Sequence, residues 1–109
     1  MPYKPSQAMQ KAARRALEFR KTLPPSKRFG TAVGLARARD IANGVNLSRD
    51  TIVRMRSFLA RHRKNREKYR GVKFESAGPG RWSWDLWGGD AAVSWVNDKI
   101  KRYKRAGEL

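Results

Sequence analysis

The sequence predicts an all-α protein: a small single-domain helical bundle with a helix-turn-helix-like pair at its centre and a tryptophan-rich block toward the C-terminus. Apolar residues recur at three- and four-residue spacing along most of the chain, which is the period of an amphipathic helix. The length of 109 residues suits one hydrophobic core. We therefore expect one domain over residues 1–109, with flexible ends at 1–5 and 104–109.

The first two helices have recognisable start and stop residues. The first is expected from Ser6, as N-cap, to Thr22, just before a Pro-Pro pair that cannot continue a helix. The second is expected from Thr31, as N-cap, to Asn43, which is followed by a glycine that can take the left-handed conformation of a helix stop. The sequence therefore predicts two helices joined by a short basic linker.

The third helix follows a short turn and has Ser48 as its expected N-cap. It is expected to run at least to His62, or in a longer version to Tyr69. Residues 63–80 are interpreted as a basic stretch followed by a glycine-containing loop. A short aromatic segment and a Gly-Gly pair then lead to the last helix, for which Asp90 is the expected N-cap.

Charge is the strongest functional signal. The chain has 26 Lys and Arg against 9 Asp and Glu, a formal net charge of +17. Most of this charge lies in residues 1–30 and 47–70, whereas a solubilising excess has no reason to cluster. Nucleic acid is the expected partner, because each neutralised phosphate releases condensed counterions. A membrane surface and simple solubility are the weaker alternatives.

The third helix has two contrasting faces. On a helical wheel, one side is expected to be buried and carries Ile52, Met55, Phe58, Leu59 and His62. The opposite face has small residues at its centre and arginines at its rims, which suits close approach to base edges in the major groove. The alternative is an ordinary amphipathic helix with a solvated basic face. The predicted DNA-binding residues are Arg49, Val53, Arg54, Arg56, Ser57, Ala60, Arg61, Arg63, Lys64 and Arg66, with further phosphate contacts from Arg14, Arg15, Lys27 and Arg28.

The tryptophans of the C-terminal block allow two interpretations. Trp87 and Trp95 are expected in the core, since large aromatic side chains dominate small cores. Trp82 is predicted either to pack in the core or, with Arg81, to form a stacking platform for unpaired bases. The second interpretation implies a preference for single strands.

No catalytic or metal-binding pattern is visible in the sequence. Asp85 is expected to pair with a nearby arginine rather than to act as a catalytic carboxylate. His62 is the only histidine and cysteine is absent, so a typical zinc site cannot be built. There is no glycine-rich phosphate loop and no nucleophile motif. We therefore expect no cofactor, no metal and no enzymatic activity.

Two blocks of sequence resemble a small domain that is widespread in bacteriophage genomes. The first is FGTAVGLARARD at 29–40, continued by NG, LS, TI, RM, SF and ARH up to residue 62. The second comprises SAG at 76–78, WDLWGGDA at 84–91 and Trp95. The resemblance covers about residues 10–100 and implies a phage-encoded protein, found alone or within phage structural or DNA-handling proteins. This sequence departs from the family pattern in its basic stretch at 63–70, which is commonly more acidic.

Together these features predict a phage-encoded DNA-binding protein whose partner is double-stranded DNA. One alternative is an interaction protein that binds an acidic host or capsid protein, including inhibition of a host factor. Another is binding of RNA or single-stranded DNA, and a homodimer is a further option for a helix-turn-helix reader. The chain shows neither a signal peptide nor a membrane-spanning run, so the host cytoplasm is the expected compartment, with virion association as the alternative.

Overall fold

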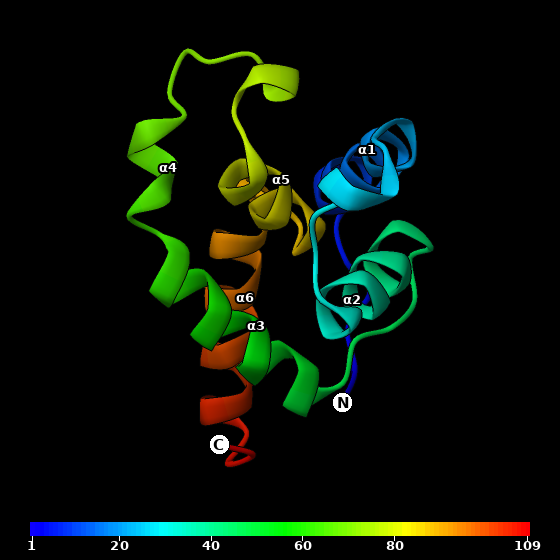
Figure 1. The fold of residues 1–109 in the computed structure, drawn as a ribbon. Helices are drawn as coiled ribbons and strands as arrows, with labels where there is room; N and C mark the ends of the chain where they lie inside the picture. The colour runs from blue at the N-terminus through cyan, green and yellow to red at the C-terminus, as the bar shows by residue number, and fades with distance from the viewer.

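The computed structural model describes residues 1–109, apart from the side chains of Asn65 and Glu67, and it confirms the all-α prediction. The helices are α1 (Gln7–Thr22), α2 (Ala32–Ala42), α3 (Arg49–His62), α4 (Asn65–Lys68), α5 (Pro79–Leu86) and α6 (Asp90–Arg105). Two short 3-10 turns lie at Pro25–Lys27 and Phe74–Ser76. Figure 1 shows α1 and α2 on one side of the molecule, with α3 and α4 on the other.

Three predicted N-caps are confirmed and the fourth is wrong. Ser6, Thr31 and Ser48 each accept a hydrogen bond from the backbone N–H three residues later, at 3.0–3.3 Å between heavy atoms. At the last helix Gly89 occupies the cap position, and Asp90 is the first helical residue. The chain enters α6 through two glycines with positive φ, so the Asp90 carboxylate points to other partners instead of to its own helix start.

Two further boundaries differ from the sequence prediction. The segment Pro79–Gly80, predicted as loop, forms the first turn of α5, because proline is well suited to the first position of a helix. The third helix ends at His62, and α4 follows it as a separate short helix instead of a continuation to Tyr69. The aromatic segment thereby belongs to one regular helix, which packs against α1.

The two central helices do not pack together as a helix-turn-helix does. They follow one another through the predicted turn, but α2 packs on α1 and α5, whereas α3 packs on α6 (Figure 1). One link between them is the hydrogen bond that Arg37 Nη1 donates to Thr51 Oγ1, at 3.3 Å. The helix that the sequence assigns to DNA recognition is therefore supported by α6 and not by α2.

The ends of the chain make specific contacts, although the sequence predicts flexible ends at 1–5 and 104–109. Tyr3 exchanges two backbone hydrogen bonds with Leu47, at 3.0 and 2.7 Å. The hydroxyl of Tyr103 donates to the backbone carbonyl of Met1. These contacts hold the N-terminal segment between the start of α3 and the end of α6.

Candidate nucleic-acid interface

The outer face of α3 is solvent-exposed, as the helical wheel predicts. Ile52, Met55 and Leu59 are buried on the opposite side, and Phe58 stacks on the ring of Trp87 with 4.3 Å between centroids. The exposed residues of the outer face are Arg54, Ser57, Ala60, Arg61 and Lys64. Because α3 has 14 residues, this face is about 21 Å long.

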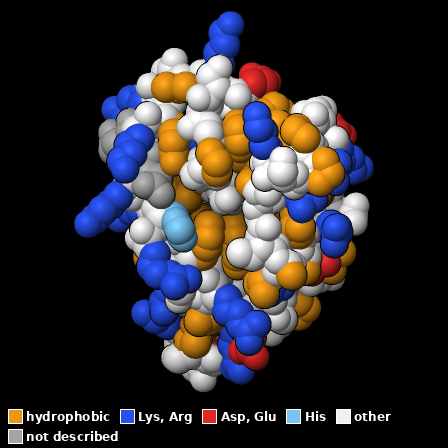
Figure 2. Space-filling model, viewed as in Figure 1, with side chains coloured by type: hydrophobic (Ala, Val, Ile, Leu, Met, Phe, Trp, Pro, Cys, Tyr) orange, Lys and Arg blue, Asp and Glu red, His pale blue; other side chains and the backbone are white. Residues whose placement is uncertain are grey.

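Most cations of this face have no partner within the protein. Among the residues that the structure describes, none forms an ion pair with Arg54, Arg61 or Lys64. The carboxylate within α3 is Asp50, which lies 3.7 Å from Arg49 in the first turn. Figure 2 shows Lys and Arg side chains running along α3 and α4, with the pale blue histidine beside them. The result is a strip of positive charge that is not neutralised by the fold.

One edge of α3 adjoins α6 across a small groove of about 80 Å³. Arg56 and Arg63, seven residues apart on this edge, line the groove together with Asn97 of α6. Lys101 and Lys104 lie four and seven residues after Asn97, on the same side of α6, and both are exposed. These lysines extend the positive strip, and the sequence analysis missed them. The net charge of the C-terminal third does not reveal them, because it also contains Asp85, Asp90, Asp98 and Glu108, two of which lie in α6 itself.

Two residues at the start of α3 are less available than the sequence predicts. Arg49 donates from Nη1 to the backbone carbonyl of Glu108, at 2.9 Å. Val53 is half-buried, and the C-terminal residue Leu109 lines the same surface pocket as Val53 and Arg54. The C-terminal tail therefore covers part of the predicted interface at this end, a long-range contact that a helical wheel cannot reveal.

The predicted phosphate-binding residues before α2 act mainly within the fold. Arg14 donates from Nη2 to the carbonyl of Ala42 at 3.0 Å, and Arg28 donates from Nε to the carbonyl of Leu23 at 3.1 Å. Lys27 is exposed and has no ion-pair partner among the described residues. Arg14 thereby links α1 to the end of α2, although its side chain remains exposed.

Trp82 belongs to an aromatic cluster and does not form an open stacking platform. Its ring centroid lies 4.8 Å from that of Phe19 and 5.2 Å from that of Phe29. Its indole Nε1 donates to the carbonyl of Phe74 at 2.6 Å. With its indole N–H bonded and two aromatic rings packed against it, Trp82 is a partly buried residue at the edge of the core. Trp87 is buried as predicted, while Trp95 is half-buried at the surface of α6.

Asp85 is the buried carboxylate at the junction of α1 and α5. Its side chain accepts a hydrogen bond from Arg15 Nη2 at 2.8 Å and lies 3.4 Å from Arg81 Nε. The expected pairing with an arginine is present, and it engages both Arg15 and Arg81, which the sequence assigned to nucleic acid. Burial raises the pKa of Asp85 above its ordinary value, although the two guanidinium groups act in the opposite direction.

The raised pKa of Asp85 gives a measurable pH dependence. A folded state that binds the proton more tightly than the unfolded chain gains stability at low pH, and this contribution is lost as pH rises through the raised pKa. In a carboxyl-detected NMR titration, we expect the midpoint of Asp85 above 3.8 and that of exposed Asp98, beside Lys99 and Arg102, below 3.8. A midpoint of Asp85 below that of Asp98 would contradict the assignment of burial as the dominant effect.

The described residues contain neither a candidate metal-binding group nor a candidate membrane-spanning helix. They contain no group of three or more His, Asp or Glu side chains placed to hold a metal ion. No described helix combines the length and the apolar character that crossing a membrane requires. Comparison with family models, curated proteins and solved structures gives no match to this chain.

Proposed function

We propose that this chain binds double-stranded DNA by docking the outer face of α3 in the major groove. The observation that carries the proposal is the exposed face of α3, where Arg54, Arg61 and Lys64 have no ion-pair partners among the described residues. Unpaired, clustered cations repel one another in the free protein. Contact with phosphates relieves this repulsion and releases condensed counterions, so a polyanion is the partner that this face suits best.

The dimensions of α3 fit the groove of B-form DNA. A helix with its side chains is about 10–12 Å wide, and the major groove is about 12 Å wide. Ser57 and Ala60 at the centre of the face leave room for close approach of the helix axis. Arg54 and Arg61 on one rim are placed to fork to guanine or to a phosphate. The proposal thus assigns base contact to the centre of α3 and phosphate contact to its rims.

The support for α3 differs from that in a helix-turn-helix protein. Because α6 lies behind and beside α3, the lysines of α6 flank the same strip that α3 presents. Lys101 and Lys104 are the residues we assign to a neighbouring phosphate backbone. The role is one of binding, with no residue assigned to catalysis.

The test is a fluorescence-anisotropy titration with duplex DNA, single-stranded DNA and RNA of the same sequence at several salt concentrations. We expect duplex DNA to bind most tightly, with a log–log salt slope of about −5 if about six phosphates are contacted. Preference for single strands or RNA would contradict the major-groove proposal. Weak binding to all three, lost at about 0.15 M salt, would instead favour an acidic protein partner.

A further inference from the structure

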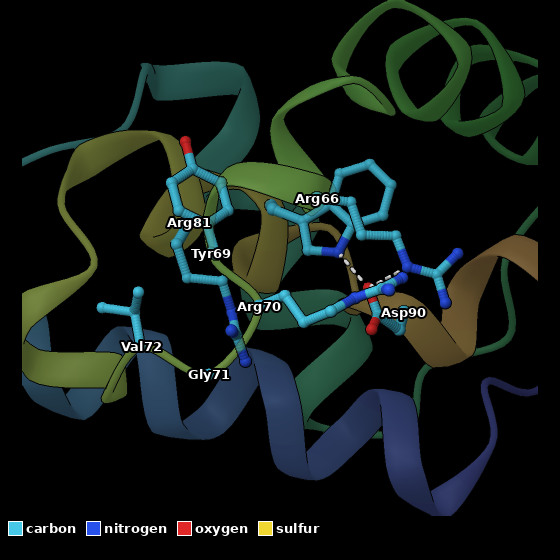
Figure 3. A pocket seen from close by; sticks show the side chains of 8 residues that line it. Arg66, Tyr69, Arg70, Gly71, Val72, Arg81 and Asp90 are labelled. Atoms are coloured by element: carbon cyan, nitrogen blue, oxygen red, sulfur yellow. Dashed lines mark hydrogen bonds and ion pairs between the residues drawn. The ribbon is translucent and has the colours of Figure 1, made fainter.

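A pocket of about 210 Å³ lies between α4 and the junction of α5 with α6, away from the groove between α3 and α6. Three arginines reach it from different places in the sequence: Arg66 in α4, Arg70 after it, and Arg81 in α5. Figure 3 shows the Arg66 and Arg70 side chains directed toward Asp90. The volume far exceeds the roughly 10–15 Å³ that one water molecule needs, so a small polyatomic ligand fits.

Two of these guanidinium groups are held in place by one nitrogen each. Arg66 Nε lies 3.3 Å from Asp90 Oδ1, and Arg81 Nε lies 3.4 Å from Asp85 Oδ2. No described residue accepts a hydrogen bond from the Nη atoms of Arg66 or Arg81. A guanidinium group has five N–H donors in a planar fork. Arg66 and Arg81 therefore each retain the donors of their two Nη groups for a ligand.

The other walls of the pocket are fixed by close packing. The buried indole of Trp84 donates from Nε1 to Asp90 Oδ1 at 2.9 Å, which orients the carboxylate that holds Arg66. Tyr69 is packed against the backbone of Gly80 so closely that a Cβ at this position would lie 1.9 Å from the tyrosine Oη. The pocket is therefore formed by the fold before any ligand arrives.

The hydrogen-bond donors of the pocket select the ligand class. Arg66 and Arg81 each face a carboxylate through Nε, so it is their outer N–H groups, and not an excess of charge, that are left to recognise a ligand. We propose that this pocket binds a phosphate monoester, which presents three acceptor oxygens to the arginine forks. A phosphodiester has only two such oxygens free and matches the forks less well. The monoester can come from a free mononucleotide or from the 5′-phosphate at the end of a nucleic-acid strand.

The direct test follows the side-chain N–H signals of the full chain by NMR during titration with adenosine 5′-monophosphate and with inorganic phosphate, at constant ionic strength. Saturable shifts of the Trp84 indole and the Arg66 and Arg81 Nε–H signals are expected, with none upon titration with adenosine. Arg66→Gln is expected to weaken binding about tenfold, the effect of losing one charge-assisted hydrogen bond. Arg105→Gln removes the same charge from the exposed end of α6 and should change nothing. An equal loss in both variants, or shifts that never saturate, would overturn the proposal.

A second pair of variants tests the pocket without changing its charge. Gly80→Ala suits a helical position but forces Tyr69 to move, so weaker phosphate binding is expected with the fold retained. Adding Tyr69→Phe removes the clashing hydroxyl and should restore affinity, since the nearest remaining ring atom would be 3.1 Å from the new Cβ. Unchanged binding in Gly80→Ala would count against the pocket.

The two sources of the monoester are separated by comparing duplex DNA with and without a 5′-phosphate. Tighter binding of the phosphorylated duplex, lost in Arg66→Gln, identifies the strand end. Binding of the free mononucleotide with no effect of the 5′-phosphate identifies the nucleotide. The titration with free monophosphates needs no duplex. Monophosphate binding in the pocket can therefore be observed even if α3 does not bind DNA, and duplex binding by α3 can be observed even if the pocket binds no monophosphate. If no monophosphate and no 5′-phosphate binds in any of these experiments, the proposal is wrong.

Discussion

The double substitution Arg54→Gln and Arg61→Gln is expected to lower the affinity for duplex DNA by at least tenfold at about 0.15 M salt, since two charge-assisted contacts are lost. The log–log salt slope should become shallower by about 1.8, because each neutralised phosphate contributes about 0.9 to it. Both residues lie on exposed α3, outside the core, so the thermal unfolding temperature should stay close to that of the unmodified protein. Anisotropy titrations at four or more salt concentrations measure both quantities.

The matched control is the double substitution Lys21→Gln and Arg39→Gln. These residues carry the same two charges but line a shallow pocket between α1 and α2. If α3 is the docking element, the control should retain its affinity to within about threefold, through the long-range field alone. Equal losses in both double variants would mean that DNA contacts a diffuse basic surface, and the assignment of α3 would then be wrong.

The accuracy of the sequence prediction follows from how local each feature is. Ser6, Thr31 and Ser48 are recognisable because an N-cap satisfies backbone donors only three residues away. The buried and exposed faces of α3 are recognisable because helical periodicity fixes them once one apolar stripe is known. Both kinds of information lie within one turn or one helix. The three caps and the burial of Ile52, Met55 and Leu59 hold in the structure, whereas Phe58 and His62, expected on the buried side, are half-buried.

The contacts that the sequence does not reveal are those whose partners lie far away in the chain. Arg15 meets a carboxylate 70 residues later, and Asp90 accepts from the indole of Trp84 instead of capping its own helix. Trp82 packs against two aromatic rings from the first third of the chain. From the sequence alone, a basic or aromatic side chain is therefore taken as available for nucleic acid, because its partner within the fold is not known.

The same limit explains the difference in the central helix pair. Turn length and capping predict two consecutive helices, and both are present. Which neighbour α3 packs against depends on the apolar stripe of α6, more than 25 residues after α3 ends. Ala92, Val96 and Ile100 of that stripe are buried and compete with α2 for the apolar side of α3. Periodicity identifies each stripe but does not pair them.

The largest effect on stability is expected from Asp85→Ala. Removal of one member of a buried ion pair costs about 3–5 kcal/mol when the remaining charge stays buried. Here the side chain of Arg15 is 51% exposed, so water and salt screen part of the loss. Arg81 is more enclosed and loses its partner. We expect destabilisation of about 2–3 kcal/mol, which corresponds to a fall in melting temperature of about 10 °C or more.

Two further variants separate the charge of Asp85 from its hydrogen bonds. Burial raises the pKa of Asp85, so the cost of desolvating the carboxylate outweighs its attraction to Arg15 and Arg81. Asp85→Asn keeps one acceptor for Arg15 and the volume of the side chain, so it should recover at least half of the loss. Asp98→Ala removes an exposed carboxylate from α6 and should leave the melting temperature unchanged. If Asp85→Asn is as damaging as Asp85→Ala in thermal unfolding monitored by circular dichroism, the attraction of the negative charge to the arginines outweighs its desolvation cost, and this expectation is wrong.

The Asp85 variants also bear on function, because they act at the junction of α1 and α5 and leave α3 on α6 undisturbed. Below its melting temperature, Asp85→Asn should bind duplex DNA through α3 with unchanged affinity. Arg81, in contrast, lines the monophosphate pocket, and Asp85 holds its Nε. Weaker binding of adenosine 5′-monophosphate is therefore expected in Asp85→Asn. Loss of duplex binding in the same folded variant would mean that the two surfaces are coupled, and the separation of α3 from the pocket would have to be abandoned.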